Sequence, residues 1–253
     1  VTWEREEGWI PDRAGVWEAS GRLSGTQIPV RLFLAVAEEE DHPRQVPPEA
    51  LDDFREASVQ IVAGNEFYQT QESMRAYLLE VDADSLLFAF RQAAGLPVKG
   101  ADPLDGWDAP DSLLRGHTTG HFLSALARCY HSCPDPRILE KVRYLVQGLG
   151  ECQQAFSRTE GFQPGFVSAY SEEQFDLLEE YTPYPEIWAP YYTLHKILAG
   201  LLDCYTYLQD ETALQIARDL GDWACRRLGR LSRPQLTRMW SMYIAGEYGG
   251  MNE

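Results

Sequence analysis

The chain has 253 residues, of which 44% are hydrophobic and 24% charged, a composition near the average for folded domains that argues against disorder. No apolar run approaches the roughly 18 to 20 residues that a membrane-spanning helix needs, so no membrane partner is expected. The formal net charge of -17 repels phosphate backbones and anionic lipid. It therefore argues against nucleic acid as a partner and favours a neutral ligand such as a sugar.

The N-terminal residues have the composition of strands. Trp3, Trp9 and Trp17, the turn-like Ser24-Gly25-Thr26 and the apolar run 28–36 predict several short strands. The acidic, Pro-containing stretch 38–48 predicts a linker or domain edge. We expect a β-rich segment over residues 1–45, interpreted as the remnant of an accessory β-sandwich, and a second domain over residues 60–253.

From about Asn65 onward, apolar residues recur at helical spacing, as in Leu78, Leu86 and Phe90. A shift of 75 residues superposes Leu123, Leu126, Cys129, Tyr130, Asp135, Leu139, Arg143 and Leu145 on Leu198, Leu201, Cys204, Tyr205, Asp210, Leu214, Arg218 and Leu220. Each copy predicts a helix, a tight turn and a second helix. Such hairpins bury their apolar faces by stacking, in an open array or in a closed toroid. Polar and aromatic loops between the hairpins favour the toroid.

His117 and His121 lie four residues apart at the predicted start of a helix. One interpretation is that they hold a metal ion, because residues at this spacing share a helix face. The zincin pattern needs Glu directly after the first His, however, and Thr118 stands there. The alternatives are imidazoles that hydrogen-bond sugar hydroxyls and a packed helix N-terminus without a ligand.

The segment 186–195 places Glu186, three aromatic residues and His195 ahead of a helix that we expect from Lys196 to Tyr207. Pro190 is favoured near such a helix start. Aromatic faces beside polar groups are typical of a sugar subsite, whereas a Tyr-Tyr-Leu stretch alone is as well explained by a core.

An acidic group follows in the residues 172–180. Two of its carboxylates are candidates for a glycosidase pair, but the spacing alone selects none. The simpler interpretation is that Glu172, Asp176 and Glu179 form one solvated helix face. The cysteines show neither a zinc pattern nor a disulfide framework, so we expect mostly buried thiols.

Four segments occur in the order typical of one family. They are Gly116–Ala127, Gly165–Tyr170, Trp188–Asp203 and Gly249–Glu253. Together they resemble the domain of unknown function 1680, placed in glycoside hydrolase families 127 and 146. The resemblance covers about residues 65–253 and implies a mainly α fold, an (α/α)6 toroid that is incomplete in this chain. It also implies a retaining enzyme that releases β-L-arabinofuranosyl or related residues from plant-type glycans or glycoproteins.

In that family the nucleophile is a zinc-bound cysteine thiolate, the acid/base is a glutamic acid, and a glutamate and three cysteines hold the zinc. These residues belong to a Glu-x-Cys motif and a Cys-Cys pair, and neither occurs in this chain. Val1 and Glu253 have the look of cut ends, so we expect the catalytic residues and zinc ligands downstream. The chain as given is then an inactive fragment without a metal ligand of its own.

The resemblance carries over the sugar-binding part of the pocket. His195 resembles a sugar-contacting histidine. The resemblance also implies that the segments containing His117, His121, Tyr192, Asn252 and Glu253 line the same cavity. Thr118 stands where many relatives have Asp, so the hydrogen bond of that carboxylate is expected to be absent or altered.

Two further hypotheses remain open. One is a non-catalytic helical-repeat module that binds carbohydrate or protein. The other is a different toroid hydrolase or lyase that uses carboxylates such as Glu186 and Glu253 as acid and base.

Overall fold

The computed structural model describes residues 2–3, 15–22, 29–36, 60–242 and 250–251. The chain divides into two compact units, Val1–Asp53 and Phe54–Glu253. Within the described residues, no helix is both long enough and apolar enough to cross a membrane.

The first unit contains a three-stranded antiparallel sheet. Its strands are β1 (Thr2–Trp3), β2 (Gly15–Arg22) and β3 (Pro29–Val36), in the order β1-β2-β3. In the register of the long pair, Gly15 lies opposite Val36 and Arg22 opposite Pro29. Strand β3 thus covers residues 29–36 of the predicted apolar run, while Trp9 and the turn-like residues 24–26 lie outside the described residues.

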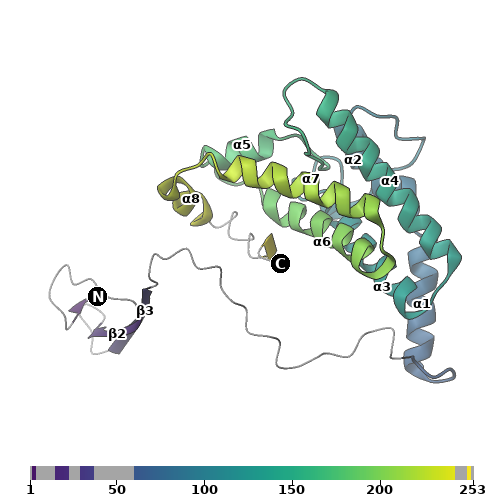
Figure 1. Ribbon diagram of the computed structural model, residues 1–253, viewed down its shortest axis with the longest axis horizontal. Helices are drawn as coiled ribbons and strands as arrows, with labels where there is room; N and C mark the ends of the chain where they lie inside the picture. Colours follow the sequence, from purple (N-terminus) through teal and green to yellow (C-terminus); the bar gives the residue numbers. More distant parts are fainter. Residues whose placement is uncertain (1, 4–14, 23–28, 37–59, 243–249, 252–253) are drawn as a thin grey trace. The chain divides into compact units, whose positions relative to one another are not determined.

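The second unit is helical (Figure 1). Its elements are α1 (Glu66–Glu80), α2 (Ala83–Ala93), the 3-10 turn η2 (Gly106–Asp108), α3 (His117–Ser132), α4 (Pro136–Arg158), α5 (Glu173–Glu179), α6 (Pro190–Leu208), α7 (Glu211–Leu228) and α8 (Arg233–Trp240). Several of these helices begin directly after a residue whose side chain caps the helix. The side chains of Asn65, Asp82, Asp135 and Asp210 accept hydrogen bonds from backbone N–H groups of the helices they precede.

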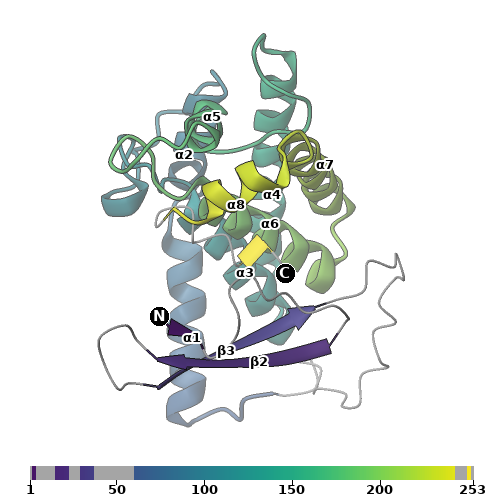
Figure 2. The same ribbon diagram turned by 90° about the vertical axis from the view of Figure 1, so that its left-hand side faces the viewer.

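The two copies of the 75-residue repeat form the helical hairpins α3/α4 and α6/α7, as the sequence predicts. Helix α3 packs along α6, and α4 contacts α7, so the hairpins stack as two layers (Figures 1 and 2). Near the helix starts, the rings of His117 and Tyr192 are 6.2 Å apart. Near the ends, the guanidinium of Arg128 lies 3.3 Å from the Asp203 carboxylate. The helices α3 and α6 therefore run in the same direction, and their N-termini lie at the same end of the layer.

Two glycines allow this close approach. A Cβ added at Gly200 would lie 2.5 Å from the carbonyl oxygen of Gly120. A Cβ at Gly120 would lie 2.7 Å from the backbone nitrogen of Ile197 and would overlap the Lys196 carbonyl group. The contacts are with backbone, which cannot rotate away as a side chain does. The separation of α3 and α6 thus depends on hydrogen atoms at these two positions.

The acidic residues of α5 correct one prediction. Glu172 is buried, and its carboxylate lies 3.2 Å from Nη1 of the buried Arg227, so it is not part of a solvated face. Glu179 and Asp176 also bind the Arg227 guanidinium. The spacing of acidic residues in the sequence did not reveal the buried Arg227 on α7, which pairs with Glu172 in the interior while the side chain of Asp176 stays exposed. The sequence prediction was therefore wrong for Glu172.

Candidate functional site

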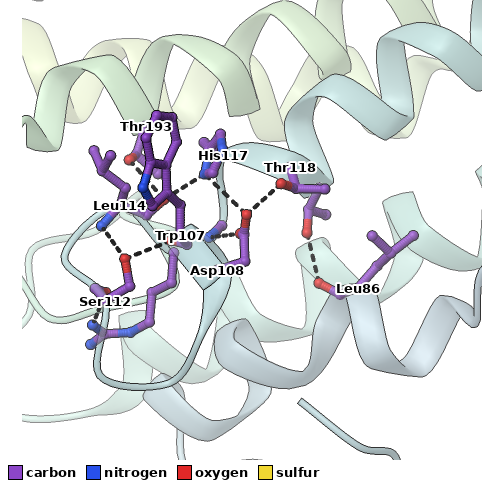
Figure 3. A network of polar contacts seen from close by, with 11 residues as sticks. Leu86, Trp107, Asp108, Ser112, Leu114, His117, Thr118 and Thr193 are labelled. Atoms are coloured by element: carbon purple, nitrogen blue, oxygen red, sulfur yellow. Dashed lines mark hydrogen bonds and ion pairs between the residues drawn. The ribbon is translucent and has the colours of Figure 1, made fainter. Parts of the chain in front are cut away.

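The predicted site residues gather where α3 and α6 begin. The turn η2 and the loop before α3 cover this end of the helix pair (Figure 3). Helix α6 begins at Pro190, six residues earlier than predicted, so Tyr192 and His195 belong to its first turns. Pro190 explains this start, because the first helical residue needs no N–H donor.

Asp108 organises the start of α3. Its side chain is buried, and Oδ1 accepts a hydrogen bond of 2.6 Å from the backbone N–H of Gly116. Gly116 has a φ of +95°, which favours glycine, and its own position lacks a side-chain cap. The hydroxyl of Thr118 donates to Oδ2 of the same carboxylate. Asp108 thus satisfies a free helix donor and fixes the first turn from outside the helix.

The same network orients His117. Its Nδ1 lies 2.8 Å from the carbonyl oxygen of Leu114 and 3.1 Å from Oδ2 of Asp108 (Figure 3). Both neighbours are acceptors, which assigns the ring hydrogen of neutral His117 to Nδ1 and leaves Nε2 as an acceptor. The Leu114 carbonyl also accepts a hydrogen bond of 3.5 Å from Thr193 of α6. The loop, α3 and α6 are therefore joined through atoms that touch His117.

Three predicted residues meet here in a group that we name the histidine–tyrosine cluster: His117, His121 and Tyr192. The ring centroid of His117 lies 6.1 Å from that of His121 and 6.2 Å from that of Tyr192. The ammonium of Lys196 lies 4.8 Å from the centroid of the Tyr192 ring. The cluster offers ring faces, imidazole nitrogens and a hydroxyl within one small region.

The pKa of His121 lies below its ordinary value. Partial desolvation is the largest cause, and the neighbouring Lys196, His117 and His195 lower the pKa further. A neutral imidazole has one donor and one acceptor nitrogen, which suits the hydroxyl groups of a neutral ligand.

His195 faces a cavity along α6. The cavity has a volume of ≈ 210 Å³ and is lined by His195, Leu198, Ala199, Leu202, Asp203, Thr206, Gly250 and Met251. Gly250 packs directly on the imidazole, because a Cβ there would overlap the His195 ring. The volume is below the roughly 300–1,000 Å³ of pockets for drug-sized ligands, so the cavity suits a small group such as one sugar. Asn252 and Glu253 lie outside the described residues.

The sequence reasoning missed Asp108, Trp107 and Lys196. Asp108 lies in a loop rich in Gly, Pro and Asp, where several carboxylates compete and the spacing favours none. The Asp108 carboxylate accepts a hydrogen bond from Thr118, which stands where many relatives are expected to have Asp. Lys196 follows His195 directly. The 75-residue shift makes Lys196 the equivalent of His121 in the repeat, and this equivalence was the signal by which it could have been found.

The described residues do not fit a zinc site. Among them, no group of three or more His, Cys, Asp or Glu side chains can hold a metal ion. Burial raises the pKa of Cys129 to about 11 and that of Cys152 to about 12, so both thiols keep their protons at neutral pH. The interpretation of His117 and His121 as a metal grip therefore finds no third ligand in the part of the chain that the structure describes.

Comparison with known proteins identifies the family. No curated protein matches the chain. A family model, described as "Beta-L-arabinofuranosidase, GH127 catalytic domain", matches residues 58–253. This range contains every helix described above and every predicted site residue. The resemblance inferred from the sequence is thereby confirmed, and the chain belongs to the GH127 β-L-arabinofuranosidase catalytic-domain family of glycoside hydrolases.

Proposed function

We propose that the helical unit binds a β-L-arabinofuranosyl group of a plant-type glycan or glycoprotein, in an enzyme that releases this group with retention of configuration. The observation that carries the proposal is the meeting of His117, His121 and Tyr192 at the shared N-terminal end of α3 and α6. The proposed whole fold is the (α/α)6 toroid, in which hairpins such as α3/α4 and α6/α7 continue around a central pocket.

The chemistry of the cluster supports a neutral sugar. The ring faces of His117 and Tyr192 offer apolar surface to sugar C–H groups, and nitrogen and hydroxyl atoms at their edges exchange hydrogen bonds with sugar hydroxyls. Asp108 and the Leu114 carbonyl fix His117 before a ligand arrives. A preorientated group loses less entropy on binding, which supports its assignment as a sugar contact.

His195 extends the proposed sugar site. The cavity that it lines has room for a small group, and His195 lies near enough to His121 to contribute to the lowering of the His121 pKa. Asn252 and Glu253 stay predicted contacts. We assign zinc, its ligands, the cysteine nucleophile and the glutamic acid to none of the described residues, so they remain predictions from the resemblance.

Ligand binding to this chain tests the proposal. Titration with L-arabinose, followed by the NMR signals of the histidine rings, should shift His117 and His121, and His117→Ala should lower the affinity. The control is His131→Ala, on the last turns of α3, where the ring lies 5.0 Å from that of Tyr207. Equal loss in both variants, or no response to L-arabinose, would contradict the assignment.

Activity is tested on the protein as it occurs naturally. It should hydrolyse p-nitrophenyl β-L-arabinofuranoside, and a zinc chelator should abolish the hydrolysis. Hydrolysis that resists the chelator would favour a carboxylate mechanism. Sugar binding without any hydrolysis would favour a binding module.

A further inference from the structure

Three aromatic side chains form a series that begins at the histidine–tyrosine cluster and continues to the surface. The ring centroid of Trp107 lies 6.3 Å from that of His117 and 6.2 Å from that of Trp188. The ring centroids of Trp188 and Tyr184 are 5.7 Å apart. Trp107 is 64% exposed and Tyr184 is 58% exposed, whereas Trp188 is half-buried. We name Trp107, Trp188 and Tyr184 the aromatic strip.

The exposure of Trp107 does not result from a loosely held segment. Trp107 is the central residue of η2, where the backbone N–H of Asp108 donates to the Asp105 carbonyl over 3.2 Å. The Ser112 hydroxyl donates a hydrogen bond of 2.6 Å to the Trp107 carbonyl (Figure 3). The next residue, Asp108, is buried on the start of α3. A fixed turn thus presents a large apolar ring to water, an arrangement that adds little to folding and is typical of a binding surface.

The far end of the strip is anchored as well. Ile187, between Tyr184 and Trp188, is fully buried. The backbone N–H of Glu186 donates to the Pro183 carbonyl over 3.2 Å. Both segments of the strip are therefore fixed through their neighbours, while their rings remain available to a ligand.

We propose that the aromatic strip is a subsite for the neutral sugar ring next to the arabinofuranosyl group. This inference rests on the proposed function. Trp107 touches His117, so a glycan seated at the cluster continues onto the strip without a break. Indole and phenol rings stack on the C–H faces of sugars. The exposed acidic residues Asp105, Asp111 and Glu186 lie beside the strip residues in sequence and disfavour a negatively charged sugar.

The occupant is thus a sugar of the same glycan, and the strip selects oligosaccharides over single arabinose residues. A ring contact of this kind is worth about 0.7–1.4 kcal/mol, which corresponds to about a 3- to 10-fold change in affinity.

Calorimetric titration compares L-arabinose with a neutral β-L-arabinofuranosyl disaccharide. The disaccharide should bind more tightly to the wild-type chain. Trp188→Ala and Tyr184→Ala should each lower the disaccharide affinity about 3- to 10-fold and leave the L-arabinose affinity within about twofold. Trp188→Phe should restore most of the loss. Phe67→Ala is the matched control, because Phe67 is 76% exposed on α1 and should change neither affinity.

Each outcome separates the two proposals. Failure of the proposed function appears as no L-arabinose binding to the wild type. Failure of the subsite appears as equal affinity for the two sugars, or as disaccharide binding that is the same in Trp188→Ala, Tyr184→Ala and Phe67→Ala. If neither sugar binds, both proposals fail. Tighter binding of a uronic acid disaccharide than of the neutral one would overturn the choice of a neutral sugar. Thermal melting shows whether each variant is folded. Tyr184→Ala should stay folded, because the side chain it removes is exposed.

Discussion

Gly120→Ala should destabilise the protein, although alanine is the better helix former. The added methyl group would lie 2.7 Å from the Ile197 nitrogen and would overlap the Lys196 carbonyl group, both in the backbone of α6. Overpacking of this kind costs about 1–3 kcal/mol. The gain in helix propensity returns about 1 kcal/mol. The obstacle is rigid backbone, so the cost should lie toward the upper end of its range, and the net loss should be about 1–2 kcal/mol.

Thermal unfolding measures this loss directly. For a domain of this size, 1 kcal/mol corresponds to about 2–4 °C, so the Tm of Gly120→Ala should fall by about 2–8 °C. The control is Gly221→Ala, in the middle of α7, where an added Cβ meets nothing within 4 Å. This variant should gain up to about 1 kcal/mol from helix propensity. The same chemical change should therefore act with opposite sign at the two positions.

The site gives a second measurement. A wider separation of α3 and α6 should weaken the nuclear Overhauser effects between the rings of His117 and Tyr192, whose centroids are 6.2 Å apart. A Gly120→Ala protein as stable as wild type, with these effects unchanged, would refute the claim that hydrogen atoms at the glycines set the helix separation.

Three more predictions concern ionisable groups. Arg227→Met leaves the buried carboxylate of Glu172 without its cation and should lower the free energy of unfolding by about 3–5 kcal/mol in urea denaturation. A thiol reagent at pH 8 should label the exposed Cys225 at once and Cys152 only after unfolding, because Cys152 is buried and its pKa is raised to about 12. The pKa of His121, followed by NMR, should lie below 6.5, and Lys196→Met should raise it by removing a positive charge. In the wild type, His121 of the unfolded chain binds a proton at a higher pH than His121 of the folded chain. The free energy of unfolding should therefore fall as the pH drops below about 6.5.

Each of these predictions has a control. Arg226→Met removes an exposed neighbour that donates to the Pro164 carbonyl, and it should cost less than about 1 kcal/mol. Equal losses in the two arginine variants would contradict the ion-cluster argument. Rapid labelling of Cys152 in the folded protein would contradict its burial. Lys99→Met should leave His121 unchanged, since Lys99 lies on the Tyr144 ring instead.

The helical repeat was predictable because periodicity and capping residues are local signals. Asn65 and Pro190 lie at helix starts, and the 75-residue shift identified the two hairpins. The close packing of α3 on α6 was not predictable from the same pattern. Gly120 and Gly200 appear in sequence only as helix-weakening residues, and their role depends on a neighbour about 80 residues away.

The sequence indicated which residues of the two helices lie together, but not the loop that supports them. The family resemblance pointed to His117, His121 and Tyr192, and the structure places their rings next to one another, while their contact with a sugar stays a prediction. Asp108 belongs to a loop, where no periodicity indicates which of several carboxylates points inward. Glu172 shows the reverse error, because its acidic neighbours suggested solvent and the buried Arg227 lies on another helix.

The equal direction of α3 and α6 gives the site an approximate internal symmetry. The 75-residue shift carries His117 onto Tyr192 and His121 onto Lys196, so one repeat supplies two imidazoles where the other supplies a phenol and an ammonium. The spacing between the repeats is set elsewhere, at Gly120 and Gly200. The side chains of the histidine–tyrosine cluster and the packing of the helices are thus encoded by separate positions of the same two helices. Substitutions in one repeat can change the hydrogen-bonding character of the site while the frame that holds both repeats stays as it is.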